Sequence, residues 1–115
     1  MLERAVYVDL VTTGPDPRHH RVLEVAAVRV IDGREAEVYH ALVNPGRAIP
    51  AGVARRTGID EREVSTTPEL RYVLPDLFRF LGTDPIVARD GERSVRAFLE
   101  TPFGYRLPNR FLDIA

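Results

Sequence analysis

The stretch that decides the fold is residues 5–14, which read AVYVDLVTTG. The continuous apolar run from Ala5 to Leu10 is typical of a strand that is buried on both faces. Successive side chains of a strand point to opposite faces, so Asp9 and residue 11 lie on the same face. Two acids at this spacing would present two carboxylates to one cation, because Mg²⁺ and Mn²⁺ prefer oxygen ligands. Residue 11 is Val11, which has no oxygen to offer.

Length and composition describe one ordinary folded domain. A chain of 115 residues supports one core and is too short for two, so we expect a single domain over residues 1–115. Hydrophobic residues at 44% and charged residues at 29% are typical of a globular protein. No stretch approaches the length of a membrane span, and no basic segment precedes an apolar run at the N-terminus. We therefore expect no membrane association and a cytoplasmic location.

Cysteine content and net charge narrow the possible chemistry. The sequence has no cysteine, which excludes disulfides, thiolate zinc sites and cysteine nucleophiles. The formal net charge is −1, so the chain as a whole does not attract phosphate. Binding of nucleic acid would therefore depend on a local patch of positive charge.

The pattern after the first strand predicts a β-meander. The turn-rich residues 14–17 end that strand. Residues 21–31 form a long, valine-rich second strand, and a hairpin turn at residues 32–33 leads into a third strand over residues 37–43. The closely spaced prolines within residues 44–50 then take the chain out of the sheet.

The second half of the chain predicts helices alternating with short strands. Apolar side chains recur every three or four positions over residues 70–81, which indicates an amphipathic helix ending at Gly82. Pro75 lies inside this helix and should kink it unless the helix restarts there. The other expected elements are short: helical turns at 53–63, a strand at 85–88, a helix at 92–100 and a strand from 111. The order βββαβαβ predicts an α/β fold with a mixed sheet, a meander first and parallel strands after it.

Several motifs match, in order and in spacing, those of DEDD-type 3′ to 5′ exonucleases. Residues 9–14 resemble the signature Asp-x-Glu-Thr-x-Gly, with Val11 in place of the glutamate. Residues 23–30 resemble the second strand of proofreading exonucleases of the DNA polymerase III epsilon-like family. Three further segments are similar to that family: the strand-three exit at 42–50, the Thr-Gly-Ile turn at 56–59 and the long helix at 68–81. The resemblance implies a ribonuclease-H-like fold.

The resemblance also implies which catalytic residues are missing. The second catalytic motif of the family reads Val-Ala-His-Asn-Ala-x-Phe-Asp, and its final Asp is a metal ligand. Residues 87–94 read VARDGERS, so Ser94 stands at that ligand position. The third motif, a general-base His followed by an Asp, would fall beyond Asp113, so we expect a domain that lacks the C-terminal helices. Of the four carboxylates that bind metal in the family, Asp9 remains in register, as a weak residual ligand.

Four residues are candidates for binding nucleic acid. In the family, Thr12 and Thr13 would lie where backbone amides meet the terminal nucleotide. Arg89 and Arg93, with Arg96 one turn later, place positive charge where the acids would have been. Guanidinium groups in place of carboxylates favour an anion over a cation, which suits phosphate binding without cleavage. The alternative for each is structural: threonines of a β-rich turn, and arginines of a solvated helix surface.

The remaining acidic and imidazole side chains favour structural interpretations. Asp9 is either the residual metal ligand or, as we prefer, a strand end that accepts hydrogen bonds from the turn at residues 12–14. His19 and His20 lie in a proline-bounded loop and are expected to be solvated. His40 is expected on a strand surface, and Glu24 is expected to have a structural role.

The function favoured by the sequence is a degenerate, catalytically inactive 3′ to 5′ exonuclease-like domain that binds nucleic acid or protein, without a tightly bound cofactor. One alternative is an active exonuclease that uses Mg²⁺ or Mn²⁺ and takes its remaining ligands from a continuation or a partner. Another is a structural adaptor that binds no nucleic acid. Because the helix covering one face of the family's sheet would fall beyond the chain, we expect a homodimer or a protein partner to cover that face.

Overall fold

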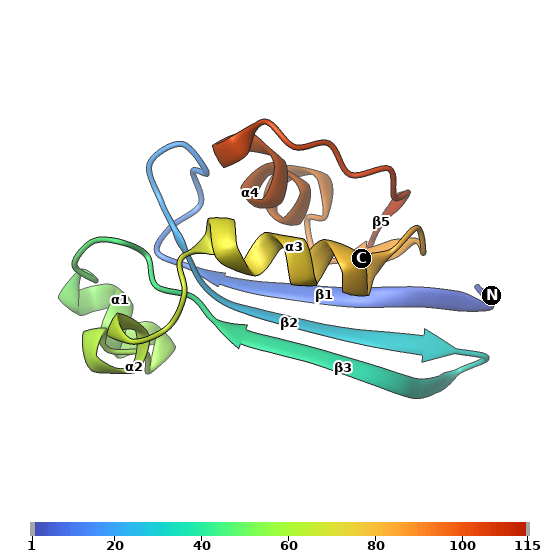
Figure 1. Ribbon diagram of the computed structural model, residues 1–115, viewed down its shortest axis with the longest axis horizontal. Coiled ribbons are helices and arrows are strands. Elements are labelled where there is room, and N and C mark those ends of the chain that lie inside the picture. The colour runs from blue at the N-terminus through green and yellow to red at the C-terminus, as the bar shows by residue number, and fades with distance from the viewer. Residues whose placement is uncertain (1, 115) are drawn as a thin grey trace.

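The computed structural model describes residues 2–114, which fold around a mixed sheet of five strands (Figure 1). The strands are β1 (Arg4–Thr12), β2 (Val22–Ile31), β3 (Arg34–Leu42), β4 (Ile86–Ala88) and β5 (Phe111–Asp113). Their order across the sheet is β3-β2-β1-β4-β5. Strand β2 is antiparallel to β1 and β3, whereas β4 runs parallel to β1 and β5 runs parallel to β4. The predicted ribonuclease-H-like sheet, a meander followed by parallel additions, is confirmed.

The helices are α1 (Ala51–Thr57), α2 (Glu61–Ser65), α3 (Leu70–Leu81), the π-helical turn η1 (Glu92–Arg96), α4 (Ala97–Glu100) and the 3₁₀ turn η2 (Thr101–Phe103). Helices α3 and α4 lie on one side of the sheet, and α1 and α2 lie beyond the end at which β1 and β3 finish (Figure 1). Within residues 2–114, none of the helices is long and apolar enough to cross a membrane.

Helix α3 contains Pro75 and continues through it, so the restart considered for this position is wrong. The proline ring leaves the carbonyl of Arg71 without its usual intrahelical donor. Both residues are exposed, so water can satisfy that carbonyl and the loss is tolerated.

The main core fills the space between the sheet and the helices α3 and α4. It contains Val6 and Val8 of β1, Val25 and Ala27 of β2, Ile86 and Ala88 of β4, four apolar residues of α3, and Phe98 and Leu99 of α4. A smaller cluster under α1 and α2 contains Leu23, Ile49, Ile59 and Val64, with Val11 packed against it. The amphipathic pattern predicted for residues 70–81 therefore faces the sheet.

No helix within residues 2–114 covers the opposite side of the sheet (Figure 1). Tyr7 is 44% exposed, Val38 65% and Ile114 48% on this side, where Asp9 is exposed as well. We call this side, carrying Tyr7, Asp9, Ala26, Val38 and Ile114, the open face. The prediction that the first strand is buried on both faces is wrong, because Tyr7 and Asp9 are exposed on the open face, whereas Val6 and Val8 pack into the main core on the other face.

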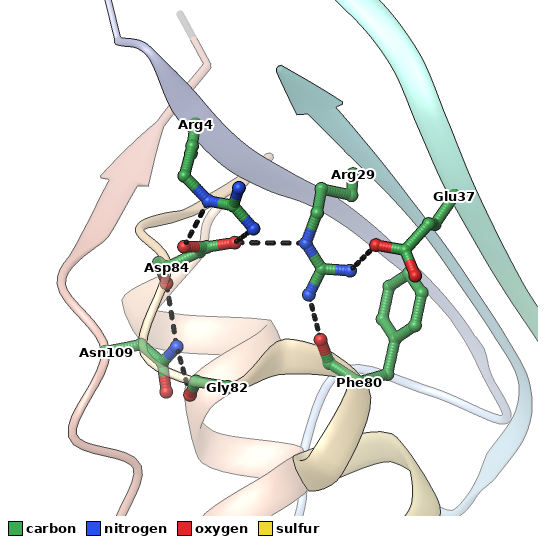
Figure 2. A network of polar contacts seen from close by, with 7 residues as sticks. All are labelled: Arg4, Arg29, Glu37, Phe80, Gly82, Asp84 and Asn109. Carbon is green, nitrogen blue, oxygen red and sulfur yellow. Dashed lines mark hydrogen bonds and ion pairs between the residues drawn. The ribbon is translucent and has the colours of Figure 1, made fainter.

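A buried arginine joins the sheet to the helices near the start of β1. Arg29 of β2 is 6% exposed, and Nε donates to Asp84 at 3.0 Å while Nη1 donates to Glu37 at 2.9 Å. Figure 2 shows the third contact, in which Nη2 donates to the carbonyl of Phe80 at the end of α3. The guanidinium carbon lies 4.4 Å from the centre of the Phe80 ring. We call this group, completed by Arg4 and Asn109, the Arg29 cluster.

Asp84 receives a second guanidinium in this cluster, because Arg4 donates to it at 3.2 Å. The amide nitrogen of Asn109 donates to the carbonyls of Gly82 and Asp84 (Figure 2). Burial acts to raise the pKa of the Asp84 carboxyl, but the hydrogen bonds and charges of Arg4 and Arg29 outweigh it, and the pKa lies below its ordinary value. Arg4 of β1 and Arg29 of β2 thus bind one carboxylate, and Asn109 ties the loop before β5 to the loop that carries this carboxylate.

Candidate functional site

Asp9 projects from β1 on the open face, where the sequence places the residual metal ligand. Its partner across the strand pair is Ala26, which in turn pairs with His40 of β3. Asp9 lines a hollow of about 370 Å³ together with Tyr7, Val8, Ala26, Val28, Val87, Arg89 and Ile114. The fold therefore brings one carboxylate, one guanidinium and apolar side chains to the same hollow.

At the position where the family signature has its second acid, this chain has Val11, whose side chain carries no oxygen. Its side chain packs against the small apolar cluster under α1 and α2. The residue directly across from it in β2 is Glu24, and the Glu24 carboxylate is paired with Nε2 of His40. His40 is exposed on the strand surface, as predicted, and Glu24 already has a partner of its own.

The turn after β1 is held by its two threonines. Oγ1 of Thr12 donates to the carbonyl of Gly14 at 2.9 Å, and Oγ1 of Thr13 accepts the N–H of Arg21 at 2.9 Å. The backbone N–H of Thr13 donates to the carbonyl of Arg21 at 2.8 Å, so it is already engaged. The nucleotide contact expected of Thr12 and Thr13 stays a prediction, and the Thr13 amide would have to exchange its bond to Arg21 to make such a contact.

The preferred interpretation of Asp9 as a support for this turn is wrong. Within residues 2–114, no hydrogen bond reaches the Asp9 carboxylate, and the turn's contacts come from Thr12, Thr13 and Arg21. The physical reason is orientation, since Asp9 still belongs to the strand and its side chain lies on the open face, away from the turn.

Ser94 lies in η1, at the start of the helix that follows β4. Its N–H donates to the carbonyl of Asp90 at 2.7 Å, and the N–H of Arg96 donates to Gly91 at 2.7 Å, a five-residue spacing that makes the turn π-helical. The turn lies against β1. Asp90 is left-handed, with φ of 52°, and the N–H of Gly91 donates to Oδ1 of Asp113 at 2.7 Å. The loop is thus fixed to β5, while the ligand position holds a hydroxyl.

The three arginines singled out in this region differ in their surroundings. Arg89 is exposed and lines the hollow beside Asp9, and Arg93 is exposed with no ion pair found within residues 2–114. Arg96 instead pairs with Glu100 at 3.0 Å, and its guanidinium lies 4.2 Å from the centre of the Phe111 ring. The expectation that Arg96 adds positive charge to the site is wrong, because its guanidinium is engaged by Glu100 of α4 and by the Phe111 ring of β5.

The residues of this site do not fit a two-metal centre. Across residues 2–114, no three His, Asp or Glu side chains come close enough together to hold a metal ion. Asp9 is the one acid among the residues that line the described hollow. Two ions held roughly 4 Å apart need several carboxylates, which a valine and a serine at the ligand positions do not provide.

Comparison with known proteins shows that this chain is similar to exonucleases. Residues 6–101 match the family model RNase_T, described as Exonuclease. The PolC-type DNA polymerase III of Thermotoga petrophila is 30% identical over 111 residues, which cover 94% of this chain and 8% of the relative. The DNA polymerase III subunit epsilon of Aquifex aeolicus is 34% identical over 91 residues, which cover 79% of this chain and 45% of the relative. The chain therefore spans less than half the length of either relative.

A solved structure of exonuclease X in complex with 5′ overhanging duplex DNA has a TM-score of 0.76 and 25% identity. The match covers 95% of this chain and 58% of that one.

Proposed function

The chain belongs to the RNase T family of exonucleases, and within that family we propose that it is a catalytically inactive exonuclease-like domain that binds a nucleic-acid strand on its open face. The observation that carries the proposal is the hollow beside Asp9. Arg89 shares this hollow with the remaining acid. Outside the hollow, Val11 packs against an apolar cluster at the position where the family signature has a glutamate.

The absence of cleavage follows from the side chains at the ligand positions. Hydrolysis of a phosphodiester needs an activated water and stabilisation of the leaving oxygen, which carboxylate-held ions provide in two-metal sites. One exposed carboxylate with water binds Mg²⁺ weakly, and Val11 and Ser94 add no charge to it. A histidine, the general base of the family's third motif, is also missing from the residues that line the hollow.

Binding is supported by the groups that the hollow does contain. The guanidinium of Arg89 can donate two hydrogen bonds to a phosphate, and the ring of Tyr7, 44% exposed, offers a surface on which a base can stack. The neighbour exonuclease X is described in complex with DNA. We propose that the terminal nucleotide of a single strand occupies this hollow.

The test measures retention and shortening of a labelled single-stranded oligonucleotide by the same protein preparation, with Mg²⁺ or Mn²⁺ present. We expect retention without shortening, and we expect Arg89→Gln to weaken binding by about fivefold. The matched control is Arg34→Gln, which removes an exposed arginine at the β2–β3 hairpin and should not change binding. Metal-dependent shortening by the unaltered chain would overturn the inactive assignment, and lack of retention would overturn the binding.

Restoring the two acids sharpens the test. We expect Val11→Glu combined with Ser94→Asp to raise the affinity for Mn²⁺, measured by calorimetry, because two carboxylates join Asp9. Shortening of the oligonucleotide should stay absent, since the double variant supplies no general base. Recovery of cleavage by these two changes alone would show that the base is not limiting.

The apolar part of the open face supports an alternative function as a protein-binding surface, in place of the nucleic-acid strand, because Tyr7 and Ile114 belong to both surfaces. Tyr7, Val38 and Ile114 are large apolar side chains that remain exposed there, and exposed apolar patches mark interaction sites. The occupant we propose is a second copy of the chain in a twofold dimer. A monomer in sedimentation at high micromolar concentration, with no binding of a hydrophobic dye, would contradict this.

A further inference from the structure

A second hollow, of about 600 Å³, lies away from Asp9 and shares no lining residue with the first. Four segments build it: the loop before β2 with the first residue of β2 (17, 18 and 20–22), residues 44–45 after β3, the start of α3 at 69–71, and the end of α4 with η2. Figure 1 shows the β1–β2 loop, the start of α3 and the end of α4 at the same end of the molecule. Phe98 of the main core lines it, so the hollow lies on the helix side of the sheet.

Positive charge predominates in the lining of this hollow. Arg18, Arg21 and Arg71 all line it, and Glu69 is the one acid among the lining residues described. Arg71 lies 3.9 Å from Glu69 in an exposed pair, which water screens strongly. Arg18 has no ion pair within residues 2–114, and Arg21 uses Nη1 on the carbonyl of His20 at 3.0 Å. The lining can therefore offer guanidinium donors to an anion.

His20 adds a donor that is held in a fixed tautomer. Its Nδ1 accepts the N–H of Asp16 at 2.9 Å, so the ring hydrogen is on Nε2. Nε2 has no acceptor among residues 2–114. The ring packs directly against Gly14, where an added Cβ would come within 2.5 Å of the ring atoms. The glycine of the Thr-Thr-Gly turn thus makes room for a histidine that lines this hollow, contrary to the expectation of a solvated loop residue.

An aromatic side chain stands at the rim. Phe103 is 45% exposed, and its ring centre lies 6.2 Å from that of Tyr105, which packs edge-on against Phe78 at 5.4 Å. This chain of contacts supports the Phe103 ring while leaving part of it open to solvent. Aromatic rings next to guanidinium groups are the combination that nucleotide-binding surfaces use, a stacking surface for the base and donors for the phosphate.

We propose that this hollow is a nucleotide-binding site, in which the base stacks on Phe103 and the phosphate lies among Arg18, Arg21 and Arg71 with His20 as a further donor. The site goes beyond the function proposed for the open face, because it uses none of its residues. An acidic peptide could use the arginines, but its carboxylates would leave the rim aromatic without a flat partner, so the combination favours a nucleotide.

The test is calorimetric titration of the full chain with thymidine monophosphate, with inorganic phosphate and with a short acidic peptide. Arg18→Gln combined with Arg71→Gln, two exposed positions, should weaken nucleotide binding by about tenfold. Phe103→Ala should weaken binding of the nucleotide and leave binding of inorganic phosphate unchanged. The matched control is Arg34→Gln combined with Arg79→Gln, which removes the same charge elsewhere on the exposed surface and should leave binding unchanged.

Amide chemical shifts keep this proposal separate from the open-face proposal. Nucleotide should shift the amide resonances of residues 18–21, 101 and 103 and leave those of residues 7–9 and 87–89 in place. Shifts confined to the second set, equal losses in the control variant, or binding of the acidic peptide without the nucleotide would each overturn the proposal. Absence of nucleotide binding at millimolar concentration would overturn it as well.

Discussion

The Arg29 cluster and the Asp9 hollow use the same residue types, arginine and acid, near opposite ends of β1. In the Arg29 cluster the buried guanidinium has two carboxylates and a carbonyl as partners, and Asp84 has two arginines. In the hollow, Asp9 and Arg89 are exposed, and no hydrogen bond within residues 2–114 reaches the Asp9 carboxylate. The comparison teaches that charges at the first end hold the fold together, whereas those at the second end are free to meet a ligand.

The largest effect expected from this comparison is at Asp84. Asp84→Ala leaves Arg29 buried with only the exposed Glu37 as a counter-charge, and a poorly paired buried charge is strongly unfavourable. We expect the free energy of unfolding to fall by about 3 kcal/mol. Urea unfolding followed by circular dichroism measures this loss.

The matched control is Asp76→Ala on the exposed side of α3. Asp76 pairs with Arg79 at 2.9 Å, but the two side chains are 67% and 78% exposed. Exposed ion pairs contribute roughly 0–1 kcal/mol, so the change should be small. Equal losses in the two variants would contradict the structural role assigned to the Arg29 cluster.

The pH dependence of stability isolates the charge of Asp84 from its packing. Because the folded pKa of Asp84 lies below the ordinary value of 3.8, its contribution is fully present above that value and is lost as the pH falls through the folded pKa. The difference in unfolding free energy between the unaltered chain and Asp84→Asn should be constant from about pH 5 to 7 and should shrink below about pH 4. A difference that stays constant in acid would show that the contribution of Asp84 does not depend on its charge.

The meander and the parallel strands after it could be predicted because they depend on patterns that the sequence carries. The alternation of β2, the helical repeat of α3 and the collinear motifs together specify the mixed sheet. The limits of the strands were harder to predict from the sequence. Strand β1 continues to Thr12, and β3 begins at Arg34 rather than at residue 37. The added residues of β3, Arg34, Glu35 and Ala36, are exposed and include no large apolar side chain, so backbone pairing includes them without a hydrophobic signal.

Which residues meet at the site could be predicted only in part, because the remaining contacts join residues that are far apart in the sequence. Asp9 and Arg89 do share a hollow. Arg96 was misassigned because its partner ring, Phe111, reaches it only through the pairing of β4 with β5. Arg29 and Asp84 are 55 positions apart, and nothing local marks them as a pair. The basic run at residues 18–21 is visible in the sequence, but its meeting with Arg71 and Phe103 is a product of the fold.

The smallest expected effect is at Gly91, in the loop that carries Arg89 beside the hollow. It tests whether contacts with β5 hold this loop in place even though the family's acids are absent. At Gly91 an added Cβ would lie 3.1 Å from Oδ1 of Asp113 and 3.3 Å from the Phe111 ring, so in Gly91→Ala these two side chains of β5 must give way by a few tenths of an ångström. We expect a loss of about 1 kcal/mol in unfolding free energy.

Gly52→Ala in α1 is the matched control, because the nearest atom to its Cβ is the tip of Arg55 at 3.9 Å. Alanine is the better helix former there, by up to about 1 kcal/mol, so the same substitution should stabilise. Urea unfolding of both variants gives opposite signs if Asp113 fixes the loop that carries Arg89, and a stabilised Gly91→Ala variant would mean that this contact does not hold the loop in place.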